Sequence, residues 1–323
     1  MIKIKKISRQ KFLSWFILLI IMTISCLLIL DNNLEISAKE RIFDPLPSWN
    51  DGKTKQKIIK FVENVSKSDG IPIKDRIAVF DYDGTLLPEK PMYVQLDFLL
   101  ETLLTEPNSS SKGLVDGENL IKSGFLAYTG MTQPEYEEKV KEFLTTAQHP
   151  RFKKPYTELI YQPMVELVKY LKLNDFQVYI CSGSDIDFVR ILANLTYGIP
   201  PENVIGTAIE KTFEISPQGV NLVRQSKLIE PLNDKAGKPV NINRYIGKIP
   251  VMAVGNSDGD IPMLQYTSSN PQANLELLLH HDDIQREYDY NQGAEKALIL
   301  AKENNWTIIT MKEDFKQVFP FQN

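Results

Sequence analysis

The chain has 323 residues, 43% of them hydrophobic and 24% charged, which is the composition of an ordinary globular protein with one large domain or two. Its formal net charge is −4, although the first eleven positions hold five basic residues and no acidic one. The rest of the chain is therefore distinctly acidic. This charge argues against nucleic acid as a partner, because binding to a phosphate backbone requires clustered lysine and arginine side chains.

The basic head, residues 1–11, precedes an apolar run over residues 12–30 that contains no charged side chain. This layout is typical of a transmembrane anchor or of a secretory signal segment. Basic flanks stay in the cytoplasm, so everything after the run is expected to lie outside the cytoplasmic membrane, either anchored or exported after cleavage. Residues 31–50 are predicted to form a polar linker. The two cysteines are Cys26, inside the apolar run, and Cys181, so the exported part cannot form an internal disulfide bond.

Apolar periodicity after the linker predicts an amphipathic helix over residues 51–67, followed by a short strand over residues 76–80. Further strands are predicted at residues 176–182, 203–209, 249–256 and 274–281. Most of them are separated by helical patterns, such as residues 164–172. Strands without polar alternation are typical of a parallel sheet that is covered on both faces. The fold class predicted is therefore α/β, with a doubly wound parallel sheet formed by residues 51–91 and 156–323.

About ninety residues separate the first two predicted strands, which is far more than a crossover connection needs. Residues 92–104 and 132–148 have helical periodicity, and the second stretch opens with Thr132 and Glu135 in capping-box spacing. Residues 92–155 are therefore predicted to form an inserted helical cap subdomain. The side chains expected to select a substrate lie in this cap, near Tyr93, Gln95 and Tyr128.

Two aspartates, Asp81 and Asp83, follow the first predicted strand directly, and Gly84 lets the chain turn away. Ligands bind beyond the carboxyl ends of the strands in such a sheet. A divalent cation can hold two close carboxylates ionised, and Mg²⁺ prefers carboxylates together with water and phosphate oxygens. One carboxylate can then attack phosphorus while the other transfers protons. An isolated pair of this kind is more often a turn or a helix cap, so its meaning depends on the other strand ends.

The ends of two other predicted strands carry complementary groups. Ser182 and Gly183 end the second strand before a helix, so a phosphate there would meet a hydroxyl group and a helix amino terminus. The fourth strand is followed by an oxygen-rich cluster that contains Asn256, Asp258 and Asp260. A lysine is needed to neutralise charge on a transferring phosphoryl group. The candidates are Lys238, Lys235 and Lys227.

Together, "FDYDGTL", "YICSGS", Lys238 and "GNSDGD" resemble the four motifs of the haloacid dehalogenase superfamily, in their order along the chain. The inserted cap is similar to that of the C1-capped, phosphoserine-phosphatase-like branch. The exported amino terminus and the run "HHDDIQREYDY" are similar to exported bacterial hydrolases of the superfamily. Its histidines, His280 and His281, are expected either to reach the ligand-binding edge or to join a network of charges at a helix start.

The resemblance implies a role for each matching residue. Asp81 is the nucleophile that becomes an aspartyl-phosphate, and Asp83 is the general acid and base. The phosphate-binding group consists of Thr85, which also supports the loop, and of Ser182, Gly183 and Lys238. Mg²⁺ is expected to be bound by Asp81, by the backbone carbonyl of Asp83, by Asn256, and by Asp260 directly or through water. The fourth motif departs from the usual GDxxxD because Asn256 replaces its first aspartate, and Asp258 is an alternative ligand.

Dehalogenases of the superfamily lack the second aspartate of the first motif, so Asp83 points to phosphoryl transfer. The function expected is a Mg²⁺-dependent phosphomonoesterase that acts on a small phosphorylated metabolite. Two alternatives stay open. One is a catalytically weak, membrane-tethered module that binds phosphate, and the other is a phosphotransferase with an alcohol acceptor.

Overall fold

The computed structural model of the protein describes residues 44–105, 127–217 and 219–322. The chain divides into two units, residues 1–45 and 46–323, and the first lies almost wholly outside the described residues. The apolar run over residues 12–30 therefore lies outside them too. Among the helices of the described part, none is both long and apolar enough to span a bilayer. The anchor or signal segment and the location outside the cytoplasm stay predictions.

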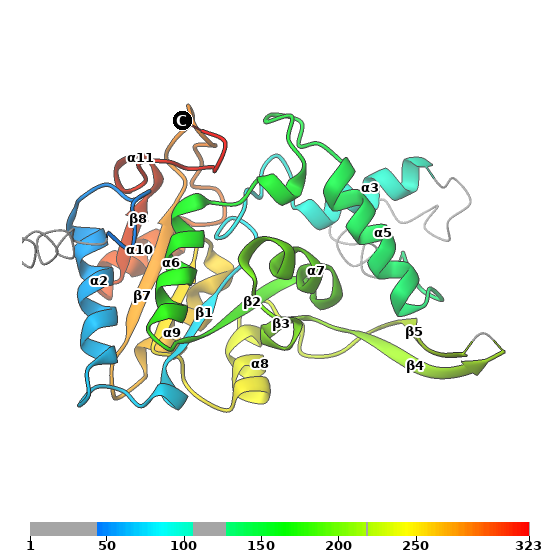
Figure 1. Ribbon diagram of the computed structural model, residues 1–323, viewed down its shortest axis with the longest axis horizontal. Coiled ribbons are helices and arrows are strands. Elements are labelled where there is room, and N and C mark those ends of the chain that lie inside the picture. Colours follow the sequence, from blue (N-terminus) through cyan, green and yellow to red (C-terminus); the bar gives the residue numbers. More distant parts are fainter. Residues whose placement is uncertain (1–43, 106–126, 218, 323) are drawn as a thin grey trace, which may run out of the picture. The chain divides into compact units, whose positions relative to one another are not determined.

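The core is a six-stranded sheet in which every neighbouring pair of strands is parallel (Figure 1). Its strands, in chain order, are β1 (Ile77–Phe80), β2 (Gln177–Asp185), β3 (Val204–Thr207), β6 (Met252–Gly255), β7 (Leu275–His280) and β8 (Thr307–Thr310). The order across the sheet is β3-β2-β1-β6-β7-β8. From β1 the chain adds β2 and β3 on one side, and it then crosses over to add β6, β7 and β8 on the other side. A crevice forms at such a switch point, here between the carboxyl ends of β1 and β6. The predicted fold class is confirmed.

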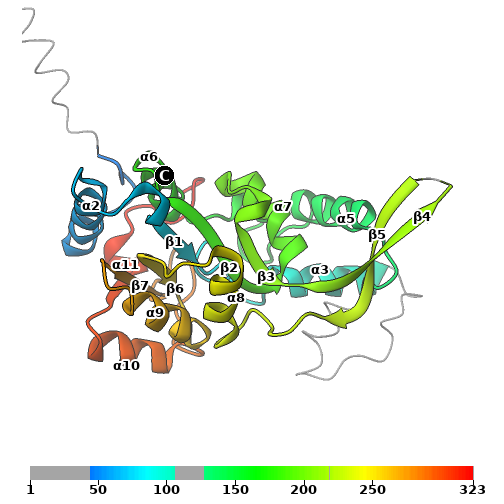
Figure 2. The ribbon, with the colours of Figure 1, turned by 90° about the horizontal axis from the view of Figure 1, so that it is seen from below.

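Helices cover both faces of the sheet (Figure 2). One face carries α2 (Lys53–Ser66), α6 (Gln162–Leu173) and α7 (Ile186–Tyr197), and the other carries α8 (Gly237–Ile246), α9 (Ile261–Ser268) and α10 (Glu295–Glu303). The short helix α11 (Met311–Asp314) follows β8. Successive residues of a strand serve opposite faces, since Ala78 and Phe80 pack in one hydrophobic cluster and Ile77 and Val79 in the other. Burial on both sides explains why these strands show no polar alternation.

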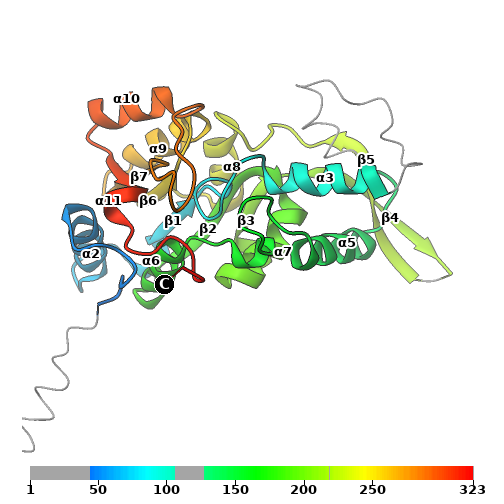
Figure 3. The same ribbon diagram turned by 90° about the horizontal axis from the view of Figure 1, so that it is seen from above.

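The cap helices α3 (Val94–Thr105) and α5 (Gln133–Thr146) lie side by side, beyond the edge of the sheet (Figure 3). The capping box is confirmed, because Thr132 accepts a hydrogen bond from the Glu135 amide and the Glu135 carboxylate accepts one from the Thr132 amide. The predicted apolar stripe of α5 is buried as expected. It consists of Tyr136, Val140, Phe143 and Leu144. The boundaries of the cap as a domain stay a prediction.

Three parts of the fold differ from the expectation. Residues 209–228 form an antiparallel hairpin of β4 (Ile209–Ser216) and β5 (Gly219–Leu228), so the third predicted strand ends earlier than expected. β8 was not predicted either. The end of the predicted linker packs on the core, where buried Trp49 donates a hydrogen bond to the Pro163 carbonyl at 2.9 Å. One-turn 3₁₀ segments occur at Ile73–Asp75, Tyr156–Glu158, Pro201–Asn203 and Asp258–Asp260.

The hairpin is joined to the cap and the core by one fully buried side chain, Arg224 of β5. Its guanidinium group pairs with Asp185 and, at 2.8 Å, with Asp187, both at the start of α7. The same group lies over the ring of Tyr136 in the cap, 3.8 Å from the ring centroid. The Arg224 backbone also donates a hydrogen bond to the Met131 carbonyl at 3.0 Å. One arginine therefore links β5, α5 and α7.

We predict that Arg224→Ala lowers the free energy of unfolding by about 3–5 kcal/mol, because it leaves the buried Asp185 carboxylate without its cationic partner, whereas Asp187 keeps Lys211 and Arg190. Lys227→Ala on the same strand is the control, since its side chain is 71% exposed and its pair with Glu210 is worth at most about 1 kcal/mol. Urea denaturation followed by circular dichroism measures both. Equal losses in the two variants would contradict the anchoring role.

Candidate active site

The segment after β1 forms a tight loop that is held on both sides. The Asp81 amide donates to the Val254 carbonyl of β6 at 2.8 Å, which places Asp81 at the crevice between the strands. Gly84 has a φ of +78°, and a Cβ atom there would lie 2.0 Å from the Asn256 side-chain nitrogen. Glycine is therefore required at this position both for its backbone conformation and for space.

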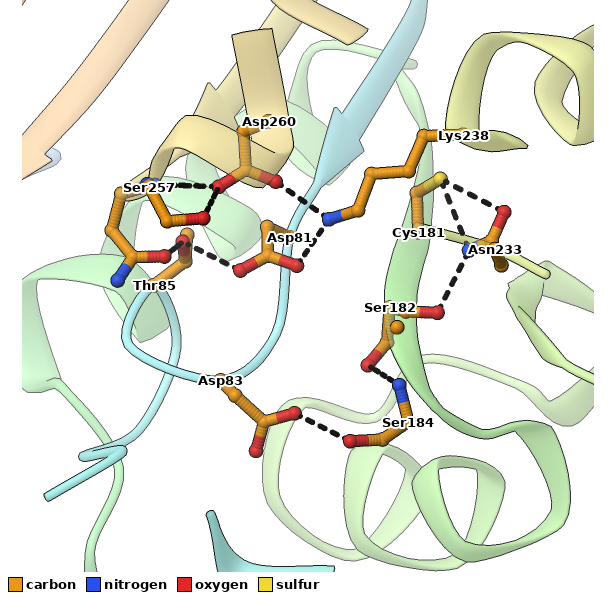
Figure 4. A network of polar contacts seen from close by, with 12 residues as sticks. Asp81, Asp83, Thr85, Cys181, Ser182, Ser184, Asn233, Lys238, Ser257 and Asp260 are labelled. Carbon is orange, nitrogen blue, oxygen red and sulfur yellow. Dashed lines mark hydrogen bonds and ion pairs between the residues drawn. The ribbon is translucent and has the colours of Figure 1, made fainter. Parts of the chain in front are cut away.

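Lys238, at the start of α8, is the lysine that reaches Asp81 (Figure 4). Its ammonium group lies 2.5 Å from Asp81 Oδ1 and 2.6 Å from Asp260 Oδ1, and the side chain is only 3% exposed. Burial alone would lower the pKa of Lys238, but the carboxylates of Asp260 and Asp81 outweigh burial and raise it. Lys235 and Lys227 have largely exposed side chains and pair elsewhere. Of the three candidate lysines, Lys238 is therefore the one in contact with Asp81, and its phosphate-binding role stays a prediction.

Asp260 connects Lys238 to the turn that follows β6. Its Oδ1 accepts from Lys238, while its Oδ2 accepts from the amides of Asn256 and Ser257, both at 3.0 Å. Both oxygens are thus engaged by protein donors, and direct coordination of a metal, the first of the two predicted modes, is not the arrangement seen. Asp258 Oδ1 accepts a hydrogen bond from the Ala297 amide of α10 at 2.8 Å, and its role as the alternative ligand stays a prediction.

Three oxygens converge on the side-chain amide of Asn256. Asp81 Oδ2, Thr85 Oγ1 and the Asp83 carbonyl lie 3.2, 3.2 and 3.1 Å from one and the same amide atom. If that atom is the nitrogen, its two hydrogens are shared among these acceptors; if it is the oxygen, it accepts from the Thr85 hydroxyl and faces the Asp81 and Asp83 oxygens directly. A cation between these oxygens would stabilise the second arrangement with Asp81 ionised.

This oxygen set fits Mg²⁺. Adjacent ligands of an octahedral Mg²⁺ with bonds of 2.0–2.1 Å are about 3.0 Å apart, close to the observed spacings. Carboxylate, carbonyl and amide oxygens are also the hard donors that this ion prefers. In the part of the chain that the structure describes, no three His, Cys, Asp or Glu side chains form a metal-binding group. Asp81, the Asp83 carbonyl and Asn256 are therefore the residues that would hold it.

The electrostatics of Asp81 agree with a cation at this position. Burial, and then the neighbouring Asp260 carboxylate, raise the pKa of Asp81 to about 8 in spite of Lys238. The protein alone thus favours a protonated Asp81 at neutral pH. A divalent cation next to its Oδ2 would favour the ionised form.

Asp83 points into the cavity and has a partner that the sequence did not indicate. Ser184 Oγ donates to Asp83 Oδ2 at 2.7 Å, whereas the buried Oδ1 has no hydrogen-bond partner (Figure 4). Burial raises the pKa of Asp83 to about 6, and the hydrogen bond from Ser184 opposes part of this rise. A carboxyl group with this pKa populates both its protonated and its ionised form near neutral pH, as an acid and base requires.

An irregularity in β2 exposes its last residues to the cavity. Cys181 pairs with Ile205 and Asp185 with Thr207, so β2 has two more residues than β3 over the same stretch. Gly183 and Ser184 line the cavity, while Ser182 is fully buried and its hydroxyl accepts from the Ser184 amide at 3.1 Å. Thr85 is also fully buried, behind Asp81. The phosphate-binding roles of Ser182 and Thr85 stay predictions.

His281 contacts the loop that follows β1. The residues after His281 form a loop, not the helix start that was one of the two expectations. His281 Nε2 lies 2.7 Å from the Gly84 carbonyl and its Nδ1 lies 3.0 Å from Glu287 Oε2. Both partners are acceptors, so both ring nitrogens must donate, which requires the imidazolium form. Burial would lower the pKa of His281, but Glu287 raises it above its usual value. His280 points elsewhere, to the Asn291 side chain at 2.7 Å.

A cavity of about 260 Å³ opens in front of these groups. It is a small cavity, below the usual range for drug-sized ligands. Tyr93 and Gln95 line it, as expected, whereas Tyr128 is buried and stacks on Phe98. The lining residues are Asp81, Asp83, Glu89, Tyr93, Gln95, Leu96, Leu99, Gly183, Ser184, Thr207, Leu232, Asp234, Lys238, Ser257 and Gly259.

Comparison with known families decides the relationship that these motifs predict. A sequence model of the haloacid dehalogenase-like hydrolases matches residues 78–265, which is more than half of the chain. The chain belongs to the haloacid dehalogenase-like hydrolase family. The predicted family is confirmed, and with it the prediction of a hydrolase. No curated protein matches this member of the family.

The chain is similar to several solved structures. A conserved, functionally unknown protein from Anaerococcus prevotii DSM 20548 is 16% identical, with a TM-score of 0.58 over 83% of this chain and 94% of its own. A protein of unknown function from Bordetella pertussis Tohama I is 14% identical, with a TM-score of 0.49 over 72% and 97%. A phosphoserine phosphohydrolase-like protein from Francisella tularensis subsp. tularensis SCHU S4 is 19% identical, with a TM-score of 0.43 over 72% and 94%. The first of these likenesses shows the fold alone.

We predict that Ser184→Ala raises the pKa of Asp83 by about half a unit to one unit. The hydroxyl hydrogen bond stabilises the ionised carboxylate by about 0.5–1.5 kcal/mol, and its loss favours the protonated form. Carbon-13 NMR titration of the Asp83 carboxyl group measures the shift. Ser269→Ala, at the exposed end of α9, is the control and leaves the pKa unchanged. A lowered or constant pKa in Ser184→Ala would rule out this role.

The contribution of His281 to stability is predicted to depend on pH. Since its pKa is raised in the folded state, the stabilisation is fully present below the unfolded value of about 6.5 and is lost as pH rises through the folded value. His281→Gln should therefore cost more at pH 6 than at pH 9 in urea unfolding. His280→Gln, which only loses contact with Asn291, serves as the control. A cost of the same size at both pH values would show that His281 is not a buried cation.

Proposed function

We propose that this hydrolase is a Mg²⁺-dependent phosphomonoesterase for small phosphate esters. The observation that carries the proposal is the convergence of Asp81, Asp83 and Lys238 in one small cavity, at the carboxyl ends of β1 and β6. Mg²⁺, when bound, supplies positive charge that keeps Asp81 ionised and that polarises the phosphate. The remaining chemistry falls to the side chains of the chain itself.

Asp81 is positioned as the nucleophile. A carboxylate oxygen of Asp81 forms a bond to phosphorus as the ester P–O bond breaks, and Asp83 gives its proton to the departing alcohol oxygen. Lys238 holds the Asp81 carboxylate in place and offsets negative charge on the transferring phosphoryl group. Gly183 and Ser184 at the end of β2 line the cavity and are placed to contact the other phosphate oxygens.

The second half of the reaction uses Asp83 in the opposite direction. Now ionised, it accepts a proton from a water molecule whose oxygen attacks the phosphorus of the aspartyl-phosphate. The Asp81–phosphorus bond then breaks, and inorganic phosphate and free Asp81 result. A pKa of about 6 suits both roles, because either form is accessible near neutral pH.

The expected result of a direct assay is release of phosphate from a panel of small monoesters in the presence of Mg²⁺. EDTA and Asp81→Asn should each lower kcat by at least about 1000-fold, since each removes a group on which the chemistry depends. Asp258→Asn is the matched control, because Asp258 lies on the same loop as Asn256 but caps α10. Adding glycerol separates hydrolysis from phosphotransfer, which would yield phosphorylated glycerol. Activity that is indifferent to EDTA and to Asp81→Asn would refute the proposal.

A further inference from the structure

The cavity contains two carboxylates that the proposed chemistry does not use. Glu89 follows the catalytic loop and is 9% exposed, and Asp234 precedes α8. Glu89 Oε1 accepts a hydrogen bond from the Tyr290 hydroxyl at 2.8 Å, which fixes its direction. Asp234 Oδ1 lies 3.0 Å from the position that a Cβ atom on Gly259 would take. These carboxylates therefore come from two different loops.

Tyr93 lies among these acidic groups. Burial raises the pKa of its hydroxyl, and the next contributions come from Glu89, Asp83, Asp81 and Asp234 in that order. All five residues line the cavity. Glu89, which is buried, and Asp234, which is half exposed, thus border the same cavity as Asp81 and Asp83.

The described lining holds four carboxylates, those of Asp81, Asp83, Glu89 and Asp234, and one cationic side chain, Lys238. Asp234 also pairs at 3.9 Å with Lys235, which does not line the cavity. Lys238 lines the cavity, but it already lies between Asp81 and Asp260. Burial raises the pKa of Glu89 even though His281, Tyr290 and Lys90 all act to lower it. A buried carboxylate in this condition is stabilised by a cation that enters from the cavity.

We infer that the alcohol part of the substrate carries a positive charge, so that the enzyme acts on phosphate monoesters of small amino alcohols. The inference rests on the proposed function and specifies its substrate class. Glu89 and Asp234 would pair with the ammonium group, and the Tyr93 ring offers a cation–π surface. Leu96, Leu99 and Leu232 supply an apolar wall for the short carbon chain. A carboxylate or second phosphate on the alcohol would meet Glu89 or Asp234 and be repelled.

Three esters test the inference directly. Phosphoethanolamine carries the ammonium group, n-propyl phosphate replaces it by a methyl group of similar size, and O-phosphoserine adds a carboxylate. For the wild-type protein with Mg²⁺, kcat/KM should be at least about tenfold higher for phosphoethanolamine than for either of the others. The expected factor corresponds to one charge-assisted hydrogen bond.

Substitutions assign the preference to its residues. Glu89→Gln keeps an acceptor for Tyr290 but loses the charge, and it should lower the ratio of kcat/KM for phosphoethanolamine to that for n-propyl phosphate by roughly 10- to 100-fold, mainly through KM. Asp234→Asn should lower the ratio only a few-fold, because the Asp234 side chain is 53% exposed. Glu202→Gln, on the exposed surface, is the control and should leave the ratio unchanged.

A binding measurement separates failure of this inference from failure of the proposed function. Calorimetry of Asp81→Asn with phosphoethanolamine and with n-propyl phosphate reports the preference without turnover. Equal binding, or an unchanged kinetic ratio in Glu89→Gln, would overturn the inference while leaving a phosphatase. Preferential binding of phosphoethanolamine to a protein that hydrolyses none of the esters would support the inference and refute the proposed function.

Discussion

The ion triad of Asp81, Lys238 and Asp260 is the constraint on which the site depends. An ammonium group that is almost fully buried is tolerated only with close partners, and Lys238 has two carboxylates at 2.5 and 2.6 Å. These three residues come from the end of β1, the start of α8 and the turn after β6. Their mutual attraction therefore determines how three separate elements meet at the edge of the sheet. Loss of Lys238 would leave two buried carboxylates facing each other without compensation.

The neighbouring elements follow from the position of this triad. Asp260 can reach Lys238 because its second oxygen binds the amides of Asn256 and Ser257, which closes the turn after β6. That turn brings the Asn256 amide against the catalytic loop, where only glycine fits at position 84. His281 then holds the Gly84 carbonyl from the other side. The loop is thus fixed by polar contacts from β6 and β7, which leave its acidic side chains free to face the cavity.

The parts of the fold that could be predicted from the sequence are those marked by a pattern of neighbouring residues. Buried strands such as β1 and β6 are uninterrupted apolar runs, and the capping box at Thr132 needs only four residues to be recognised. The position of Asp81 and Asp83 at the cavity could be predicted because residue spacing and the strand end coincide. Lys238 could be proposed but not distinguished from Lys235, because the distinction lies in a contact with Asp81 across 157 positions of the chain.

The parts that were missed depend on tertiary contacts. The hairpin carries apolar side chains on one exposed face, including Phe213 and Ile215, so burial does not explain its strands and Arg224 holds it instead. The run after β7 predicted either histidines at the ligand-binding edge or a helix start, and the structure has a loop in which His281 turns inward to Gly84. Ser184 could have been noticed as the second serine beside Gly183. Its role, however, depends on the extra residues in β2, which become visible only in pairing with β3.

Asn256 stands where the fourth motif usually has an aspartate, and this replacement changes how charge is distributed over the cavity. An amide oxygen can bind Mg²⁺ without adding negative charge where the phosphate dianion must approach. Glu89 and Asp234 place negative charge at the other lining loops, where the alcohol part of an ester would lie. The cavity thus carries less negative charge near the cation than a second metal-binding aspartate would give. Further negative charge lies away from the cation. An ester with an anionic phosphate at one end and a cationic group at the other is complementary to that distribution, and this complementarity favours one orientation of the substrate over its reverse.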